Sequence, residues 1–329
     1  MLTEDDLTRF YEDLPEKLTE PLWITIGNFD GLHLGHQALL SRLRSLAQAQ
    51  GAQSGMLTFW PHPRVFFQGI DGPFYLTTKS EKQELLKHSG LDLVITLAFN
   101  QAFADLSAEA FFDLLTSRIN LQGLVVGENF ALGKNRSGTL DVIQQLCAER
   151  GIQLEVFPPF NLDGEPVSSA RIRTALEKGD VEQAARLLGR LYFVRSQVIE
   201  GKRLGSKLGF PTANQLALEQ KILPKYGVYA TYVRWNGERY QGVTSVGVRP
   251  TFEESGQPNI ETLLLDFTGN IYHEELTVEF AHFIREEIKF ANAQELIDQI
   301  EQDKIIARRL LSDEPYPQNL PSQPQSVQR

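Results

Sequence analysis

The sequence WITIGNFDGLHLGH occupies residues 23–36 of this 329-residue chain. Its first four residues are mostly apolar and β-prone, which predicts a buried strand. Gly27 and the Asp30-Gly31 pair then end the strand with residues that are typical of turns. Beyond Gly35, leucines recur at helical spacing over residues 37–46, which predicts a helix. The stretch is therefore expected to be a strand–turn–helix unit with two histidines in its turn.

Those two histidines, His33 and His36, occupy a place that favours a bound anion. The N-terminus of a helix presents backbone N–H groups and the positive end of the helix dipole, and the glycines allow the backbone to approach a ligand closely. Imidazole N–H groups donate to phosphate oxygens. A lone loop histidine is usually an ordinary surface residue, but two of the chain's six histidines fall in one HxGH. The spacing therefore predicts a phosphate site.

The composition restricts the class of protein. Hydrophobic residues make up 42% and charged residues 22%, as in ordinary globular proteins, and the length favours two domains. The net charge of −10 argues against a general nucleic-acid or membrane-surface partner, so a phosphate site has to be a local pocket. The single Cys147 excludes an intrachain disulfide. Without a long apolar run or a signal-like start, the expected location is the cytoplasm. The oligomeric state is left open.

Short strands alternate with helices as far as about residue 178. Such alternation predicts a mostly parallel, doubly wound sheet, in which ligands bind at the carboxyl ends of the strands. His33, His62 and Asn129 each follow a predicted strand directly, which favours one shared site. Predicted strands are 23–26, 55–59, 91–97, 124–126 and 152–157, and predicted helices are 37–46, 78–88, 107–118, 140–150 and one that ends at about residue 178. Residues 1–20 are expected to be a short amphipathic lead-in.

The segment VSSARIR at residues 167–173 closes this half of the chain. A serine can cap the following helix, and a hydroxyl plus an arginine suits a phosphate at the helix start. By itself the segment is more typical of a plain capped helix than of a phosphate site. Beside the HxGH it is expected to be a second phosphate clamp formed by Ser168, Ser169 and Arg173.

The pattern changes from about residue 194. Four β-rich runs and the Asn236-Gly237 hairpin signal predict an antiparallel barrel or sandwich. Residues 293–311 return to a helical pattern, with acids early and bases late as the helix dipole prefers. Residues 313–329 are rich in Pro, Gln and Ser and are expected to be disordered. The predicted domains are 1–185 and 186–312, followed by the tail 313–329.

A second chemical stretch, GKRLGSKLGFPTAN, spans residues 201–214. It lacks the order of a Walker loop. Its glycines at four-residue spacing and its two lysines still suit a loop wrapped on phosphates, although a plain hairpin loop would have similar spacing. Thr212 and Asn214 offer oxygen ligands for a hard cation such as Mg²⁺.

Two resemblances follow from these motifs. The run GNFDGLHLGH (27–36) resembles the signature of the HxGH nucleotidyltransferase superfamily, whose members bind ATP over a Rossmann-like sheet. GFPTAN (209–214) resembles the signature of riboflavin kinases, with further matches at PKYGVYA (224–230), GVRPTF (247–252) and Glu261. Over residues 20–311 the chain resembles the prokaryotic bifunctional riboflavin kinase/FMN adenylyltransferase family, also called FAD synthetase. Leu132 and Ala170 depart from the family pattern where an aromatic residue and a threonine are usual.

The resemblance implies a Rossmann-like nucleotidyltransferase domain followed by an antiparallel β-barrel kinase domain with a C-terminal helix. It also implies that riboflavin is phosphorylated to FMN with ATP, and that FMN is adenylylated to FAD with a second ATP and release of pyrophosphate. The implied catalytic residues are Glu261 as general base in the kinase site, and His33 and His36 in the adenylyltransferase site. Implied phosphate-binding residues are these two histidines with Gly27, Phe29, Asp30, Gly31, Ser168, Ser169, Arg173, Gly201, Lys207, Gly209, Thr212 and Asn214.

Mg²⁺ is expected to bind with ATP at Thr212 and Asn214. The residues expected to bind the flavin are Phe59, Pro61, Asn129 and Arg285. Two alternatives remain at this level. One is a nucleotidyltransferase for another phosphorylated substrate, with the barrel as an accessory. The other is a non-catalytic regulator that binds flavin nucleotides.

Overall fold

The computed structural model describes residues 8–200, 210–216, 220–248 and 258–312. The chain divides into two compact units. The first comprises residues up to Asp71 and Thr77–Val167, and the second comprises Gly72–Leu76 and the described residues from Ser168 onward. The predicted loop glycines Gly201 and Gly209, together with Lys207 and the tail 313–329, lie outside the described residues.

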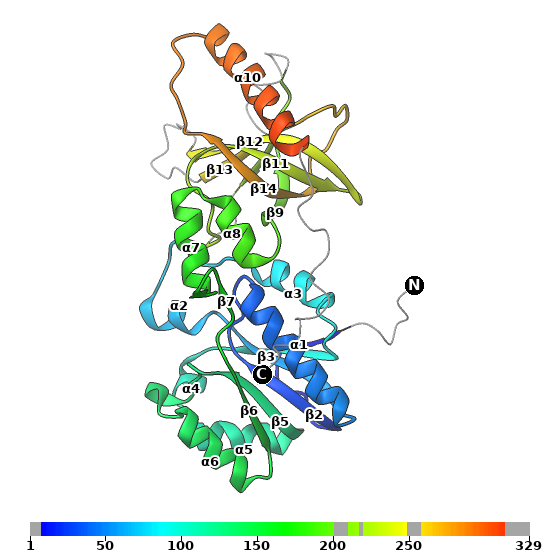
Figure 1. Cartoon of the computed structure of the whole chain (residues 1–329), viewed down its shortest axis with the longest axis vertical. Coiled ribbons are helices and arrows are strands. Elements are labelled where there is room, and N and C mark those ends of the chain that lie inside the picture. The colour runs from blue at the N-terminus through cyan, green and yellow to red at the C-terminus, as the bar shows by residue number, and fades with distance from the viewer. Residues whose placement is uncertain (1–7, 201–209, 217–219, 249–257, 313–329) are drawn as a thin grey trace. The chain divides into compact units, whose positions relative to one another are not determined.

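The first unit alternates strands with helices (Figure 1). Its elements are β1 (Arg9–Tyr11), β2 (Leu18–Ile26), α1 (Leu34–Ala49), β3 (Gln53–Trp60), α2 (Pro63–Gln68), α3 (Lys79–Lys87), β4 (Leu93–Ala98), α4 (Gln101–Ala104), α5 (Ala108–Arg118), β5 (Ile119–Gly127), the 3-10 turn η2 (Lys134–Arg136), α6 (Leu140–Glu149), β6 (Gln153–Phe157), β7 (Asn161–Leu162) and β8 (Glu165–Pro166). Six strands form one sheet in the order β1-β4-β3-β2-β5-β6, and all neighbours are parallel. The predicted Rossmann-like sheet is confirmed.

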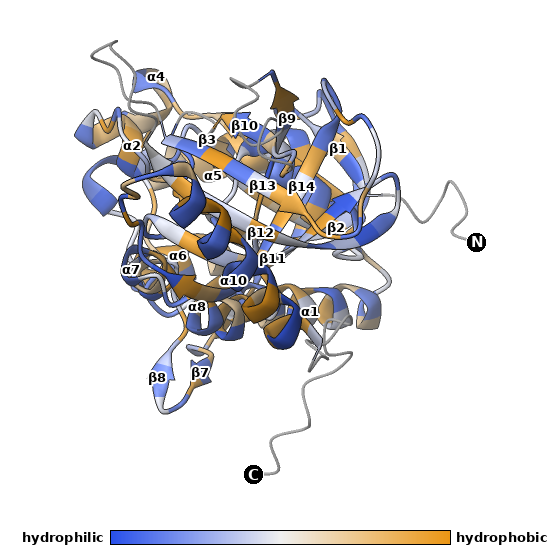
Figure 2. Cartoon of the chain, turned by 90° about the horizontal axis from the view of Figure 1, so that it is seen from above, coloured by the Kyte–Doolittle hydropathy of each residue, from blue (hydrophilic) through white to orange (hydrophobic). Residues whose placement is uncertain are grey.

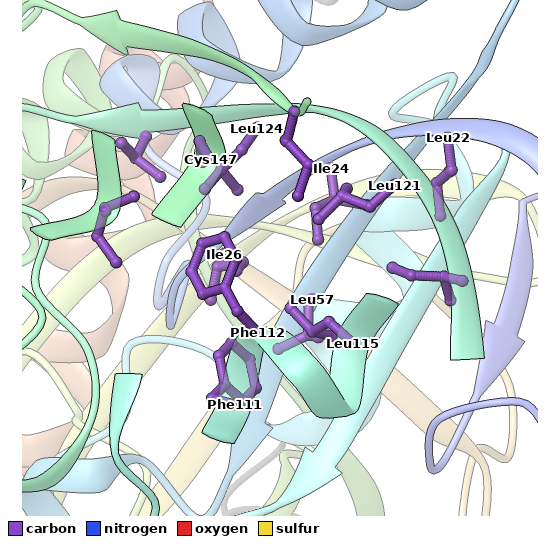
Figure 3. Packing of buried hydrophobic residues seen from close by; sticks show 14 of the residues in the cluster. Leu22, Ile24, Ile26, Leu57, Phe111, Phe112, Leu115, Leu121, Leu124 and Cys147 are labelled. Atoms are coloured by element: carbon purple, nitrogen blue, oxygen red, sulfur yellow. The ribbon is translucent and has the colours of Figure 1, made fainter. Parts of the chain in front are cut away.

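Helices cover both faces of this sheet because its central strands are apolar on both sides. On one face, Leu22, Ile24 and Ile26 of β2 pack with Phe111, Phe112 and Leu115 of α5 and with Cys147 of α6 (Figure 3). On the other face, Trp23 belongs to a cluster with leucines of α1 and with Leu86 of α3. Strand β2 is therefore held from both sides, which fixes the position of the turn that follows it.

Two elements of the first unit were not predicted. Residues 9–11 form the edge strand β1, which pairs only with β4, and β2 begins at Leu18 rather than at Trp23. The lead-in interpretation of residues 1–20 was wrong for these positions. A three-residue edge strand is too short to show a period of two, and the first residues of β2 are polar or exposed.

The second unit begins with two helices and continues into a barrel. Its elements are α7 (Ser169–Lys178), α8 (Val181–Leu188), β9 (Tyr192–Ile199), β10 (Ala213–Leu216), β11 (Gly227–Trp235), β12 (Glu238–Val248), β13 (Pro258–Leu264), β14 (Glu275–Arg285) and α10 (Ala293–Ser312). The strands close into a barrel in the order β10-β13-β12-β11-β14-β9 with all neighbours antiparallel. This confirms the predicted barrel and its C-terminal helix.

The barrel has an inner and an outer apolar surface, because side chains alternate along each strand. Val198, Ala213 and Val233 belong to one cluster. Ala230 and Leu263 belong to another, which also contains Ala307 and Leu311 of α10. Helix α10 therefore covers the outer face of the barrel, and its alternating hydrophobic and hydrophilic bands are visible in Figure 2. Glu261 has the same strand parity as Leu263 and so lies on this outer face.

Candidate active sites

The turn after β2 lies at the point where the order of the first sheet reverses. From β2 the chain moves to β3 and β4 on one side, and later to β5 and β6 on the other. At such a switch point the connections diverge and leave a crevice at the carboxyl ends of the strands. The HxGH follows β2 there, and His33 is the N-cap of α1. The sequence-predicted anion site is thus built on a rigid strand and a helix start.

The two histidines of the turn are in mutual contact. Their rings are stacked, with centroids 3.6 Å apart and an interplanar angle of 16°. His33 is 6% exposed, and its Nδ1 accepts the backbone N–H of His36 at 3.3 Å. That nitrogen therefore carries no proton, and the donor of a neutral His33 is Nε2. The ring of Phe29 lies 4.9 Å from that of His36, so three predicted site residues are brought together.

The turn has strained backbone angles, and hydrogen bonds from buried groups hold it in shape. Phe29 and Leu32 have φ of 50° and 41°, values that cost energy for residues with a side chain. Asp30 is buried, and its Oδ1 accepts the N–H and the hydroxyl of Thr77 at 3.1 and 3.3 Å. The N–H of Gly31 donates to Thr77 Oγ1 at 3.2 Å. In the structure the carboxylate of Asp30 holds the turn in shape, a role that the sequence did not suggest.

A buried lysine braces the other end of the same turn. Lys82 of α3 is 6% exposed, and its Nζ donates to the carbonyl oxygen of Asn28 at 3.0 Å and to Thr58 Oγ1 at 3.4 Å. Burial lowers the pKa of Lys82 from 10.5 to about 8, and the nearby Asp30 opposes that shift. Sequence analysis missed Lys82 and Thr58. The capping box of Thr78 and Glu81 marks the start of α3, but burial of the next residue is a tertiary property.

An apolar pocket lies at the carboxyl ends of β3 and β4. It is lined by aromatic and aliphatic side chains from both strand ends, from α2, α4 and α5, and from the segment after β5. These are Phe59, Phe67, Phe99, Phe103, Ala104, Leu106, Phe111, Leu132 and Gly133. Phe59 was predicted for the flavin, and Leu132 lines the pocket where the family resemblance implies an aromatic residue. Pro61 follows β3, and Asn129 follows β5, where its carbonyl oxygen accepts Arg136 Nη2 at 3.3 Å.

The SSxxIR residues start helix α7 of the second unit. Ser168 is the N-cap and its Oγ accepts the N–H of Arg171 at 3.3 Å, as the sequence predicted for a capping serine. Arg173 Nε donates to the carbonyl oxygen of Phe74 at 2.9 Å, and the guanidinium lies 4.4 Å from the Phe74 ring centre. Ser169 is the first residue of the helix. That these residues share a phosphate site with the histidines stays a prediction.

In the barrel, the register brings the kinase residues together. Asn214 on β10 is directly opposite Glu261 on β13, and Glu261 is in turn opposite Ser245 on β12. Residues paired in this way have Cα atoms about 4.5–5.5 Å apart. The side chain of Asn214 donates to the carbonyl oxygen of Thr212 at 3.3 Å. Asn259 Nδ2 donates to Glu261 Oε1 at 2.8 Å, and the sequence had not suggested Asn259.

Arg285 is engaged by helix α10. Its Nε and Nη2 donate to the two carboxylate oxygens of Asp303 at 3.0 and 2.7 Å, and its Nη1 donates to the carbonyl oxygen of Glu286 at 2.9 Å. Asp303 is 2% exposed and also accepts Gln299 Nε2 at 2.9 Å. In the structure Arg285 fastens α10 to β14, and its flavin role stays a prediction.

Comparisons with known proteins cover both units. A family model for FAD synthetase matches residues 16–171, and one for riboflavin kinase matches residues 188–311. The bifunctional riboflavin kinase/FMN adenylyltransferase of Pseudomonas fluorescens is 40% identical over 287 residues, which is 87% of this chain and 92% of that protein. The protein of the same name from Bacillus subtilis (strain 168) is 36% identical over 294 residues, 88% of this chain and 92% of that protein.

A solved structure named as a macrolide-efflux protein from Streptococcus pneumoniae has the same fold. It matches with a TM-score of 0.81 and 27% identity, over 92% of this chain and 99% of that chain. None of the helices in the described ranges combines the length and the hydropathy that crossing a bilayer requires. The two family models and the identity to relatives over most of their length show that the chain belongs to the family of bifunctional riboflavin kinase/FMN adenylyltransferases.

Proposed function

We propose that this chain converts riboflavin into FAD in two ATP-dependent steps, one in each predicted domain. The barrel domain, residues 186–312, would form FMN, and residues 1–185 would join FMN to AMP from a second ATP. The observation that carries the proposal is the register of β10 and β13, which sets Glu261 opposite Asn214 of the GFPTAN motif. A carboxylate acts as a general base only where it is held within reach of the hydroxyl that it deprotonates.

In the kinase step, Glu261 takes the proton of the riboflavin 5′-hydroxyl while the oxygen attacks the γ-phosphorus of ATP and ADP leaves. The hydrogen bond from Asn259 holds one carboxylate oxygen of Glu261 in place. Phosphoryl transfer otherwise needs positioning and neutralisation of charge. The Gly201–Gly209 loop is expected to cover the phosphates.

Thr212 and Asn214 fit a magnesium ion, since a hydroxyl and an amide carbonyl are hard oxygen ligands. Within the described ranges no group of three His, Cys, Asp or Glu side chains could hold a metal ion. Mg²⁺ usually keeps few protein ligands and binds mainly to substrate phosphates. When bound, the ion would neutralise charge on the ATP phosphates.

In the adenylyl step, the FMN phosphate attacks the α-phosphorus of ATP, and the bond to the β-phosphate oxygen breaks to release pyrophosphate. The phosphate nucleophile is already ionised, because its second pKa is near 6, so no base is required. His33 and His36 donate to the developing charge, and the turn of Gly27, Phe29, Asp30 and Gly31 shapes the pocket. Ser168, Ser169 and Arg173 are proposed to bind the departing phosphates.

The pocket lined by Phe59 is the proposed seat of the flavin ring, because its aromatic walls suit a flat apolar ligand. Pro61 and Asn129 are proposed to lie at its edge. An adenylyltransferase for another substrate would not need Glu261 opposite Asn214, and a regulator without catalysis would need neither that pair nor the stacked histidines. We expect the protein to act in the cytoplasm on ATP, riboflavin and FMN.

The test uses the purified protein with riboflavin, ATP and Mg²⁺, and follows FMN and FAD by chromatography. Glu261→Gln is expected to slow FMN formation by about 10²–10⁴-fold and to leave the conversion of FMN into FAD unchanged. His33→Ala should slow FAD formation by about 10²–10³-fold and spare the kinase step. Each variant is the folding control of the other. Loss of both steps in either folded variant, or of neither, would contradict the proposal.

A further inference from the structure

Lys82 is a buried charge that the proposed chemistry does not use. It lies in the first turns of α3, next to the capping box, and its side chain reaches into the first unit instead of to solvent. Lysine is almost never fully buried without a partner, because removing the ammonium from water costs several kcal/mol.

The ammonium of Lys82 makes hydrogen bonds to the HxGH turn and to the neighbouring strand β3. Its ammonium donates to the carbonyl oxygen of Asn28 at 3.0 Å and to Thr58 Oγ1 at 3.4 Å, and the Thr58 hydroxyl itself donates to the same carbonyl at 3.2 Å. Asn28 directly precedes Phe29, which has the positive φ of 50°. The lysine thus fixes the peptide group at which the backbone of the turn is strained.

The charged groups around the ammonium are few. Asp30 of the turn attracts it, and Lys79 of its own helix repels it. From β3 it meets Thr58 and the ring of Trp60, whose centre is 5.9 Å away. Asp30 is itself occupied with Thr77, so the pair is not a simple closed salt bridge. The positive charge of Lys82 therefore lies at the turn and opposes the negative charge that Asp30 places there.

Stability alone does not explain the lysine. The Asn28 carbonyl keeps a donor in Thr58 if the ammonium is removed, so the hydrogen bond to the turn does not by itself require a lysine. A positive charge behind a backbone turn does suit a turn that faces a polyanion. It raises the local potential, and it polarises the peptide whose N–H belongs to Phe29.

We propose that Lys82 is a positioning residue of the adenylyltransferase site, whose protonated ammonium fixes the Asn28–Phe29 peptide for triphosphate binding and thereby sets the alkaline limit of FAD formation. The inference rests on the proposed adenylyl transfer at the HxGH turn. Burial agrees with such a limit, since it lowers the pKa of Lys82 to about 8. The substrate phosphates titrate near pH 6 and do not produce it.

The experiment measures kcat/KM for ATP in the FMN-to-FAD reaction from pH 6.5 to 10, because this parameter reports groups of the free enzyme. The wild-type rate is expected to fall above about pH 8. Lys82→Met should lower kcat/KM about ten- to hundredfold at pH 7, the usual effect of losing a supporting group, and should lose the alkaline decline. Lys82→Arg keeps the charge and should move the decline to higher pH.

Two controls separate this role from a general loss of fold. The kinase reaction of each variant should keep the wild-type rate and pH profile, and Lys87→Met, which alters an exposed lysine paired with Glu84 on the same helix, should change neither reaction. If FAD forms but Lys82→Met has the wild-type profile, the inference about Lys82 is wrong and the proposed function stands. If the wild-type protein forms no FAD at all, the proposed function itself fails.

Discussion

The ammonium of Lys82 and the carboxylate of Glu261 show two ways in which one residue depends on its neighbours. Glu261 lies on an outer strand face, and a hydrogen bond from Asn259 helps to orient it. Lys82 is enclosed, and its environment works against its charge, since burial lowers its pKa to about 8. Orienting a side chain costs little free energy, whereas enclosing a charge costs much. Substitution of Lys82 should therefore change the free energy of unfolding, whereas substitution of Glu261 should hardly change it.

This difference predicts how stability depends on pH. An unfolded lysine keeps its proton to about pH 10.5, whereas folded Lys82 releases it near 8. Between these values the unfolded state binds more protons, so the free energy of unfolding rises with pH. Below pH 8 the full cost of the buried charge is present. The shift corresponds to on the order of 3 kcal/mol, which should be recovered as the pH rises through that window.

The measurement is denaturant unfolding of the wild type and of Lys82→Met at pH 7.5 and pH 10. Since other groups titrate in the same range, the quantity of interest is the difference between the two proteins. The free energy of unfolding of the wild type should rise relative to that of Lys82→Met between pH 7.5 and pH 10, because only the wild type recovers the cost of the buried charge. A difference between the two proteins that is equal at both pH values would mean that Lys82 is not the group that titrates.

At the scale of elements, α10 is fixed to the barrel near the proposed kinase site. Ala307 and Leu311 pack in one cluster with Phe210, the residue that precedes Pro211-Thr212. The ammonium of Lys304 lies 5.3 Å from the Phe210 ring centre. The buried carboxylate of Asp303 binds Arg285 with two hydrogen bonds. The helix therefore supports the segment at Phe210 that leads into the proposed Mg²⁺ ligands, although it supplies none itself.

Asp303→Ala is expected to reduce stability by on the order of 3 kcal/mol, because it removes one partner of a buried pair. The denaturant midpoint for loss of riboflavin phosphorylation should fall, and the adenylyl step should be unaffected. Arg308→Ala is the matched control on the same helix. The Arg308 guanidinium lowers the pKa of Asp266, but the pair is exposed to solvent and screened, so its loss should be nearly silent. Equal effects of the two changes would contradict this account of α10.

The elements that sequence analysis found are those whose signals are local. The helices predicted from residues 78 and 107 begin at the N-caps Thr78 and Ser107, and a serine, Ser168, caps α7 as expected. The sequence analysis did not predict helix α8 and assigned its residues to the region of a domain boundary. In the structure Asp180 caps this helix, and Gly189 ends it with a φ of 71°. Eight residues hold only two turns of helix, so the apolar stripe was too short to recognise beside a linker-like Gly179-Asp180.

The residues of the candidate sites also divide into those with a local sequence signal and those without one. His33, Asn214 and Glu261 were predicted because they belong to recognisable sequence motifs. Lys82, Asn259 and Asp303 were missed, because their importance lies in what encloses or faces them after folding. A lysine, an asparagine and an aspartate without motif context are most often solvated surface residues. Such supporting residues can be found only once strand register and burial are known.

For the whole molecule, each unit has apolar clusters of its own. The sheet of the first unit has one on each face, and the barrel has one inside and one outside. Two separate sets of clusters agree with two separate reactions, since the HxGH turn rests on one set and the Asn214–Glu261 pair on the other. The boundary between the units matters for any attempt to separate the reactions.

Helix α8 decides where an isolated kinase piece should begin. The riboflavin kinase family model starts at residue 188, but α8 contacts β14 and β9 of the barrel. Ala185 of α8 belongs to the outer barrel cluster together with Leu191. A piece that begins at 188 would lose these contacts and expose apolar surface, at about 25 cal/mol for each Å².

We therefore predict that residues 168–312 form a more stable riboflavin kinase than residues 188–312. Both pieces should be compared by denaturant midpoint and by FMN formation, with the full chain as reference. The longer piece should remain below the full chain, because Gly72–Leu76 also belongs to the second unit and the carbonyl oxygen of Leu76 accepts Lys221 Nζ at 2.7 Å. Adding Ala185→Asp to the longer piece should remove its advantage. Equal midpoints for the two pieces would show that α8 is dispensable to the barrel.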